Sequence, residues 1–216
     1  PLTLTKPKPM LEVGGKPLLH HILDTLPTEV DEVILVVGYL GEQIKNYFGS
    51  KFERFSITYL KQKGKLGTAH ALGLAEPLLP AGERFLMLYA DDLQSKADIA
   101  ACVKYPLAIL VKEVEDPRRF GVVLTDAAGY LTGLMEKPEN PPSNLVSVGV
   151  MVLDNRIFAY PAPQQSNGEY YLVDSLAALA EDYPVKTVTT SFWLPVGYPE
   201  DLQKAEAFLN AAKLSA

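Results

Sequence analysis

The chain has 216 residues, 48% of them hydrophobic and 21% charged, which is enough to bury the core of a single domain. Lys and Arg total 20 against 26 Asp and Glu, a net charge of -6, and there is no basic run that could track a nucleic-acid backbone. The single cysteine cannot form an internal disulfide, and no apolar stretch reaches the ~18 residues that a membrane span needs. These properties predict a cytoplasmic protein with neither nucleic acid nor a membrane as a partner.

Hydrophobic spacing in the first half of the chain predicts alternating helices and strands. Leu and Ile recur at helical intervals over 18–26 and stop at Pro27. The next apolar run, 33–37, is rich in β-branched residues, which is typical of a strand covered on both faces. The pattern then predicts a short helix at 43–48, a strand at 55–60, a helix at 68–79 and a strand at 85–89. Such alternation is typical of an α/β fold with a mostly parallel sheet.

From about residue 106 the predicted strands follow one another without long helices between them. Strands are expected at 107–111 and 121–124. A turn at 127–130 should lead into a third strand that ends at 135, and a fourth strand is expected at 146–153. Part of this half should therefore be antiparallel and packed against the first sheet. Helices return at 169–181 and 200–213. No repeat or linker divides the chain, so we expect one domain over 1–216, a Rossmann-like mixed, mostly parallel sheet flanked by helices.

Candidate metal ligands follow the predicted strand at 85–89. Asp91 and Asp92 come at its carboxyl end, where ligands collect in open parallel sheets. Carboxylate oxygens suit Mg²⁺, which typically takes one or two protein carboxylates and completes its shell with phosphate oxygens and water. The alternative is that one of these aspartates caps the next helix or closes a turn.

Three further segments carry candidate binding groups, each with a simpler explanation. Prolines stiffen the segment 6–9, so Lys8 could face phosphates, or it could be solvated in a turn. The glycines at 64 and 67 could let backbone approach a ligand, with Thr68 capping the following helix, although a glycine pair is a weak signal. Glu136 and Lys137 could bind hydroxyls and a phosphate, or could form an ordinary strand exit.

Other titratable residues are expected to have structural roles. Glu169 and Asp174 flank the predicted start of a helix, where the helix dipole favours acids whatever the function. His20 and His21 are adjacent on a helix and point in different directions, while His70 stands alone in another helix. Surface or core positions are expected for the three histidines in preference to metal binding.

Taken together, these segments resemble the sugar-1-phosphate nucleotidyltransferases, also called nucleotide-sugar pyrophosphorylases. The resemblance runs from Leu2 to about Ala207, and the order of the motifs is more specific than any one of them. Ala90 stands where the family usually has glycine. Residues 1–11 and 15–18 are similar to the family's segment that follows its glycine-rich loop. Gln62 and residues 66–69 are similar to the segment that binds the nucleobase, and residues 88–91 to the strand end that binds the metal. The motifs on the sugar side correspond to 120–123, 136–138, 147–150 and 169–174.

The resemblance implies a fold of the nucleotide-diphospho-sugar transferase type, with a nucleotide-binding half at 1–105 and a sugar-binding half at 106–216. It implies transfer of a nucleoside monophosphate from a nucleoside triphosphate to a sugar 1-phosphate, with Mg²⁺ and by in-line attack. Lys8 matches the lysine that neutralises phosphate charge in the transition state, and Asp91 matches the magnesium ligand. Gln62, Gly67 and Thr68 match base contacts, and the sugar or sugar-phosphate contacts are Gly121, Glu136, Lys137, Gly149 and Glu169.

Two departures from the family pattern are expected to matter. The family begins with a strand and a glycine-rich loop that holds the triphosphate, so we expect about twenty further residues before Pro1 in the natural protein. Near the other end, Pro195 stands where a second metal-binding Asp or Asn is expected, and proline cannot ligate a cation. Either Asp92 or Glu169 is then expected to assist Asp91.

Three functions stay open on this basis. The first is the active nucleotidyltransferase, and the second is a non-catalytic nucleotide-sugar-binding or regulatory paralogue, which Pro195 would favour. The third is a cytidylyltransferase that acts on a non-sugar phosphate. The base and the sugar stay undetermined, because a side chain such as Gln62 can hydrogen-bond several bases. A homo-oligomer is compatible with the sequence, which leaves the oligomeric state open.

Overall fold

The structure is a computed structural model that describes residues 5–196 and 201–207. Its helices are α1 (Leu18–Asp24), α2 (Gly41–Phe48), α3 (Gly67–Ala75), α4 (Lys96–Cys102) and α5 (Leu172–Asp182), and residues 201–207 are also helical. Short 3-10 helices are η1 (Lys8–Met10), η2 (Glu76–Leu78), η3 (Pro117–Arg119) and η4 (Asn155–Ala159). The strands are β1 (Glu12–Val13), β2 (Lys16–Pro17), β3 (Glu32–Val37), β4 (Lys51–Phe52), β5 (Phe55–Lys61), β6 (Arg84–Leu88), β7 (Asp92–Gln94), β8 (Ala108–Glu113), β9 (Gly121–Thr125), β10 (Leu131–Glu136), β11 (Leu145–Asp154), β12 (Lys186–Thr189) and β13 (Trp193–Pro195).

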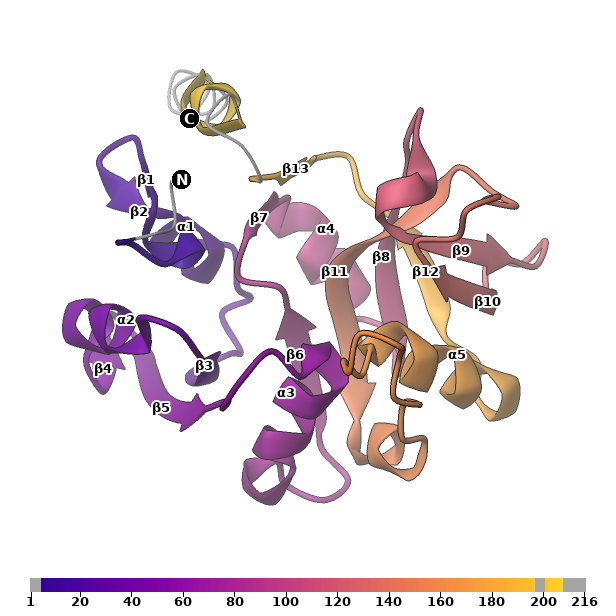
Figure 1. The fold of residues 1–216 in the computed structure, drawn as a ribbon, viewed down its shortest axis with the longest axis horizontal. Helices are drawn as coiled ribbons and strands as arrows, with labels where there is room; N and C mark the ends of the chain where they lie inside the picture. Colours follow the sequence, from indigo (N-terminus) through magenta and orange to yellow (C-terminus); the bar gives the residue numbers. More distant parts are fainter. Residues whose placement is uncertain (1–4, 197–200, 208–216) are drawn as a thin grey trace.

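The largest sheet is built around the long strand β11. Five of its strands have the order β10-β9-β11-β8-β12, and the sixth strand, β6, also pairs with β11. β8 and β12 are parallel, whereas β11 is antiparallel to β6, β8 and β9. Since β6 and β8 both run opposite to β11, they point the same way, and their carboxyl ends lie at the same edge. Figure 1 shows β8, β9, β10 and β12 on one side of the molecule, with α5 beside them.

A second sheet lies toward the N-terminal side and has the order β3-β5-β4. β3 and β5 are parallel and aligned from Glu32 opposite Ser56 to Val37 opposite Lys61, while β4 forms a hairpin with β5. The two sheets and their helices confirm the mixed α/β fold, with an antiparallel portion in the second half as predicted. Among the described residues, direct parallel pairing occurs in β3–β5 and β8–β12, so antiparallel pairs are more frequent than the sequence suggested.

The apolar residues that the sequence pattern selected form the core. Leu18, Leu19, Ile22 and Leu23 are buried on α1, and α5 buries Leu172, Val173, Leu176 and Leu179 against the main sheet. β3 and β6 behave differently, because the apolar residues 33–37 and 85–88 are only partly buried. Among the described strands, β3 pairs only with β5 and β6 pairs only with β11. Side chains of both strands pack against the apolar cluster that contains the buried residues of α1.

The start of α5 corrects the predicted helix at 169–181. The helix begins at Leu172, because the segment before it is extended and its backbone is engaged elsewhere. Tyr170 donates its N–H to the Leu66 carbonyl at 2.9 Å and accepts from the Ala69 N–H at 3.0 Å. Glu169 therefore precedes the helix, and the helix dipole does not explain its position.

Thr68, which was expected to cap α3, does not do so, and neither Asp91 nor Asp92 caps the next helix, which was the simpler alternative for these two residues. Leu66 precedes α3, and the Thr68 hydroxyl accepts a hydrogen bond from the Leu172 N–H at 2.9 Å. Ser95 caps α4 by accepting from the Asp98 N–H, while Asp92 is the first residue of β7. Capping therefore does not explain the two aspartates, whereas the turn of that alternative is present, because Asp91 lies in the turn between β6 and β7.

Seven of the described helices and strands were not predicted from the sequence, namely β1, β2, β4, β7, α4, β12 and β13. Of the helix expected at 200–213, residues 201–207 are helical and the rest lies outside the described residues. In the part of the chain that the structure describes, no helix is both long and apolar enough to cross a membrane.

Candidate active site

Lys8 and Asp91, which are 83 positions apart, form an ion pair at the carboxyl end of β6. The distance from Lys8 Nζ to Asp91 Oδ2 is 2.8 Å, and the two side chains keep 30% and 41% of their accessible surface. Lys8 opens η1 between Pro7 and Pro9, whose rings restrict the backbone that carries it. The predicted phosphate-facing lysine and the predicted metal ligand therefore share one site that solvent can reach.

Asp92 is chemically unlike its neighbour, because it is buried. Its carboxylate accepts a hydrogen bond from Trp193 Nε1 at 2.9 Å. Burial, and then the charge of Asp91, raise the pKa of Asp92 to about 7, although the Trp193 hydrogen bond and Lys8 act in the opposite direction. The buried carboxyl group of Asp92 therefore keeps its proton to a higher pH than an ordinary aspartate does.

Pro195 lies next to these aspartates, as the sequence comparison implied. It stands opposite Asp92 in the β7–β13 pairing, and the following Val196 N–H donates to the Asp91 carbonyl at 3.2 Å. A side chain at position 195 is therefore part of the wall beside the acidic pair. Proline places no oxygen or nitrogen ligand there.

The connection into β13 is held by Asp98 on α4. Its carboxylate accepts from the Thr190 hydroxyl at 2.9 Å, the Ser191 N–H at 2.6 Å and the Ser191 hydroxyl at 2.7 Å. Burial acts to raise the pKa of Asp98, but the hydrogen bonds from Ser191 and Thr190 outweigh it, and the pKa is lowered. The Asp98 carboxylate therefore fixes the position of the chain segment from which Trp193 donates its hydrogen bond to Asp92.

We expect Asp98→Ala to lower the free energy of unfolding by about 1–2 kcal/mol at pH 7, because three donors lose a charged acceptor while water replaces part of the loss. A lowered folded-state pKa means that the stabilisation is present above the unfolded pKa of about 4 and is lost as the pH falls through the folded value. Urea unfolding of both proteins at pH 7 and pH 3 checks this. Equal midpoints at pH 7, or a difference that persists unchanged at pH 3, would contradict it.

The residues predicted to contact the base meet around the start of α3. Gln62 donates through Nε2 to the Gly67 carbonyl at 2.9 Å and lies 3.1 Å from His70 Nδ1. Gly67 has a φ of +85°, and a Cβ there would lie 2.3 Å from the Tyr170 carbonyl oxygen. Glycine is therefore required at this position by the close approach of the 164–172 segment. The segment around Gly67 therefore packs against the protein's own backbone.

Glu136, Lys137 and Gly121 form a second group at the ends of β9 and β10. Gly121 and Glu136 are opposite one another in the β9–β10 pairing, and the Lys137 ammonium lies 3.0 Å from Glu136 Oε1. The hydrogen bond to Glu136 raises the pKa of Lys137, to which the charge of Glu169 also contributes. Lys137 has a φ of +43°, a backbone conformation that residues other than glycine rarely adopt. These residues combine an acid and a base close to the predicted Glu169.

Tyr89 and Gly149 lie between the two groups. Gly149 has a φ of +75°, and a Cβ there would approach Tyr89 Cδ2 to 2.5 Å, while the Tyr89 N–H donates to the Gly149 carbonyl at 2.9 Å. Burial, with a smaller contribution from the charges of Glu136 and Asp91, raises the pKa of Tyr89 to about 12, although a hydrogen bond with Thr68 acts in the opposite direction. Tyr89 therefore lies close enough to both Asp91 and Glu136 for each carboxylate to influence its pKa.

The predicted residues therefore fall into two groups along β11. Lys8 and Asp91 lie where β6 ends, and Gly121, Glu136, Lys137 and Glu169 lie around the start of β9 and the end of β10. Gln62, Gly67 and Thr68 adjoin them through α3. The sequence motifs included Tyr89, Tyr170 and Trp193 without giving any of them a role. An aromatic residue directly before an acid at a strand end was the available signal for Tyr89.

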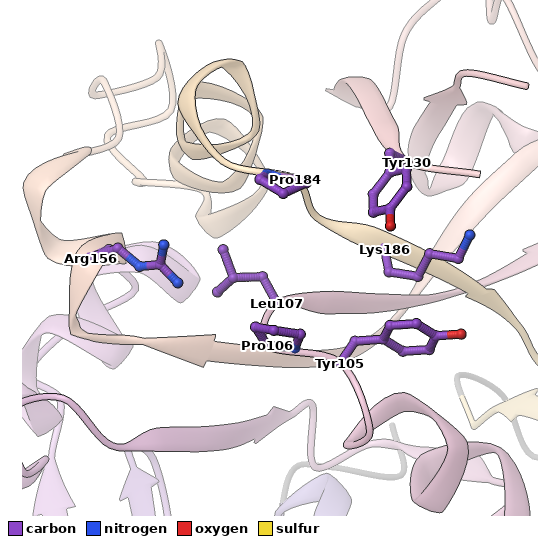
Figure 2. A pocket seen from close by; sticks show the side chains of 7 residues that line it. All are labelled: Tyr105, Pro106, Leu107, Tyr130, Arg156, Pro184 and Lys186. Carbon is purple, nitrogen blue, oxygen red and sulfur yellow. The ribbon is translucent and has the colours of Figure 1, made fainter. Parts of the chain in front are cut away.

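A separate hollow of about 210 Å³ contains none of these residues. Figure 2 shows its lining by Tyr105, Pro106, Leu107, Tyr130, Arg156, Pro184 and Lys186. It lies at the starts of the parallel strands β8 and β12, the edge opposite to the one where β6 delivers Asp91. A second pocket of about 350 Å³ lies between α3 and η4, and its lining includes His70 and Tyr170.

Residues 1–212 match the family described as nucleotidyl transferase. The chain belongs to this family. The nucleotidyl transferase chain is 36% identical over 223 residues to the UTP–glucose-1-phosphate uridylyltransferase AglF of Haloferax volcanii, covering 97% of this chain and 90% of that protein. It is 35% identical over 212 residues to the bifunctional protein GlmU of Methanocaldococcus jannaschii, covering 97% of this chain and 50% of the relative.

A solved structure of UDP-glucose pyrophosphorylase complexed with UDP-glucose has the same fold as this nucleotidyl transferase. The TM-score is 0.84 at 24% identity, and the match covers 98% of this chain and 93% of that one. At such identity the likeness concerns the fold alone. The chain spans about half the length of the GlmU relatives that it matches.

Proposed function

We propose that this chain transfers a nucleoside monophosphate from a nucleoside triphosphate to a sugar 1-phosphate, releasing pyrophosphate and a nucleoside-diphosphate sugar. The observation that carries the proposal is the Lys8–Asp91 ion pair at the carboxyl end of β6, at 2.8 Å and open to solvent, in a chain of this family. A cation and a hard oxygen ligand side by side suit a triphosphate with its metal.

The donor set fits Mg²⁺, because the Asp91 carboxylate is a hard oxygen ligand and already lies against the positive Lys8 ammonium. The side chain is also partly exposed, so phosphate oxygens and water can complete the coordination shell. When bound, this ion would neutralise charge on the triphosphate. Asp91 would hold it, and we propose that Asp92 assists in preference to Glu169, since Asp92 adjoins Asp91 while the charge of Glu169 acts on Lys137. The second metal ligand of the family is not needed for such a site.

In the proposed reaction a phosphate oxygen of the sugar phosphate attacks the α-phosphorus. The bond from that phosphorus to the bridging oxygen breaks, and its electron pair leaves with pyrophosphate. Lys8 exchanges its contact with Asp91 for the α-phosphate and stabilises the charge that develops there. Catalysis is thus mainly positioning and charge stabilisation, and no covalent enzyme intermediate is required.

Substrate-binding roles are assigned by position. Gln62 and Gly67 are proposed to contact the base, and Thr68 to do so through its backbone, because its hydroxyl is engaged by Leu172 and Tyr89. The sugar and its phosphate would lie against Gly121, Glu136, Lys137, Gly149 and Glu169. The lining of the site supports a division into a nucleotide half at 1–105 and a sugar half at 106–216. A cytoplasmic location and the oligomeric state stay predictions.

A panel assay of pyrophosphate release tests the function and its alternatives. Triphosphates of each base would be combined with glucose 1-phosphate, other sugar 1-phosphates and phosphocholine, in the presence of Mg²⁺. Release that requires a sugar 1-phosphate supports the proposal. Release with CTP and phosphocholine alone would replace it with the non-sugar cytidylyltransferase.

The regulatory alternative is motivated by Pro195, which offers no ligand opposite Asp92. If one firm carboxylate suffices, the wild-type protein turns over with Mg²⁺, and Pro195→Asp changes kcat by less than about tenfold. Steady-state kinetics of the two proteins check this. A silent wild type in which Pro195→Asp creates activity would instead support a regulatory paralogue that has lost its second ligand.

A further inference from the structure

Three potential metal ligands outside the active site converge where α1 meets the β4–β5 hairpin. They are His20 and Asp24 on α1 and Glu53 in the hairpin turn, and their ligand atoms all lie within 4.8 Å of one another. His20 Nε2 is 3.8 Å from Asp24 Oδ2 and 3.6 Å from Glu53 Oε1. The ligand atoms of a tetrahedral zinc ion, bound at ~2.1 Å, are about 3.4 Å apart. Small side-chain rotations would therefore bring these atoms to a bonding arrangement.

The backbone around this cluster is firmly placed. His20 and Asp24 are four residues apart, so they lie on one face of α1. The turn that carries Glu53 is held to the end of α1 by Arg54, which donates to the carbonyls of Leu26 and Pro27 at 2.9 Å each. The His20 ring also packs edge-on against Phe52 of β4, with ring centroids 4.9 Å apart. The three ligands thus come from elements that are already joined.

A positive group already occupies the space that a metal ion would take. Lys16 Nζ is 3.0 Å from His20 Nε2 and 3.9 Å from Asp24 Oδ2. An ammonium can only donate, so Nε2 accepts and the imidazole is neutral, the form that ligates metals. Burial, and then Lys16, lower the pKa of His20, in agreement with this form. Lys16 is about half exposed and can move away into solvent.

The chemistry of the three ligands selects the class of ion. One imidazole and two carboxylates suit a divalent first-row transition metal, and zinc is commonly held by such sets. Two carboxylates with a neutral imidazole also balance the charge of a divalent ion once Lys16 has left. His20 is buried, whereas Asp24 and Glu53 keep 43% and 52% of their side-chain surface, so the ion has access and room for a water ligand.

We propose that His20, Asp24 and Glu53 form a binding site for a divalent transition metal, which displaces Lys16 and links α1 to the β4–β5 hairpin. The site is separate from Asp91 and does not depend on the proposed reaction. Its role would be to stabilise the part of the fold that carries Lys8, because η1 packs on α1.

Thermal unfolding and calorimetric titration of the untagged, metal-stripped full-length protein with ZnCl₂ test the proposal. At a free zinc concentration about 100-fold above Kd, the melting temperature should rise by about 5 °C or more. Lys16→Met should strengthen zinc binding by about tenfold or more, since it removes the competing ammonium. Glu53→Gln and Asp24→Asn change exposed side chains and should each lose most of the zinc response without unfolding the protein.

Two controls separate this site from others. Asp91→Ala should keep the zinc-induced shift, and so should His70→Gln, which changes a histidine outside the cluster. Cobalt in place of zinc should give visible absorption bands that disappear in Glu53→Gln. A Lys16→Met protein that shows no zinc-dependent shift would overturn the proposal, as would an undiminished shift in Glu53→Gln and Asp24→Asn.

Discussion

Replacing Asp91 with alanine should abolish magnesium-dependent turnover and leave the fold intact. Losing a catalytic metal ligand removes several kcal/mol of transition-state stabilisation, so kcat should fall by about 10³-fold or more. The fold should survive because the Asp91 side chain is 41% exposed, and its main partner is Lys8. Removing its charge also relieves the repulsion that helps to raise the pKa of the buried Asp92. Steady-state kinetics with Mg²⁺, together with thermal unfolding, measure both effects.

Asp31→Ala is the matched control, because Asp31 is an exposed aspartate that precedes β3 and lies outside the two groups of the site. It should have the turnover of the wild type. Near-normal turnover of Asp91→Ala would remove the assignment of this carboxylate. A loss of activity that is accompanied by a large fall in melting temperature would show that Asp91 has a structural role instead.

Lys8→Ala should lower kcat by about 10²–10³-fold and change the KM for the nucleotide much less. The reason is that the proposed contact of the ammonium strengthens as charge develops on the α-phosphate, so it is worth more in the transition state than in the bound substrate. In the unliganded protein Lys8 is already held at the site by Asp91. Initial-rate kinetics over a range of triphosphate concentrations separate the two parameters.

Lys6→Ala gives the matched control for this experiment. Lys6 belongs to the same proline-rich segment, but its ammonium pairs with the exposed Glu12 at 2.7 Å. Its loss should leave kcat within about twofold of the wild type. If Lys8→Ala instead raises KM with kcat unchanged, Lys8 is a residue for ground-state binding and not for catalysis.

Long periodic segments could be predicted from the sequence, and short ones could not. The helices α1 and α2 and the strands β3, β5, β6 and β11 each carry enough apolar residues, in a regular spacing or an unbroken run, to be recognised from the sequence. β12 is four residues long and is defined by its pairing, with Val188 opposite Leu110, a partner far away in sequence. β7 and β13 likewise stabilise one another across a long separation. Such strands depend on tertiary contacts more than on local pattern.

The candidate site was predictable as a set of residues but not as a geometry. The order of the motifs selected Lys8 and Asp91, yet only the fold brings them to 2.8 Å. The start of α5 was misplaced because acids before a helical pattern resemble its first turn, whereas backbone hydrogen bonds of Tyr170 keep that segment extended. The buried Asp92 accepts a hydrogen bond from Trp193, about a hundred residues away, and no local pattern reveals this contact.

In the proposed reaction the nucleoside monophosphate, with its α-phosphorus, moves directly from the triphosphate to a sugar phosphate. A single-turnover experiment with a triphosphate labelled at the α-phosphorus tests it most directly, using the natural protein, Mg²⁺ and the sugar 1-phosphate that the panel selects. The label should pass to the nucleoside-diphosphate sugar, with one unlabelled pyrophosphate released per product and none retained on the protein. A protein that binds nucleotide sugar tightly and yet releases no pyrophosphate with any substrate pair would contradict the account.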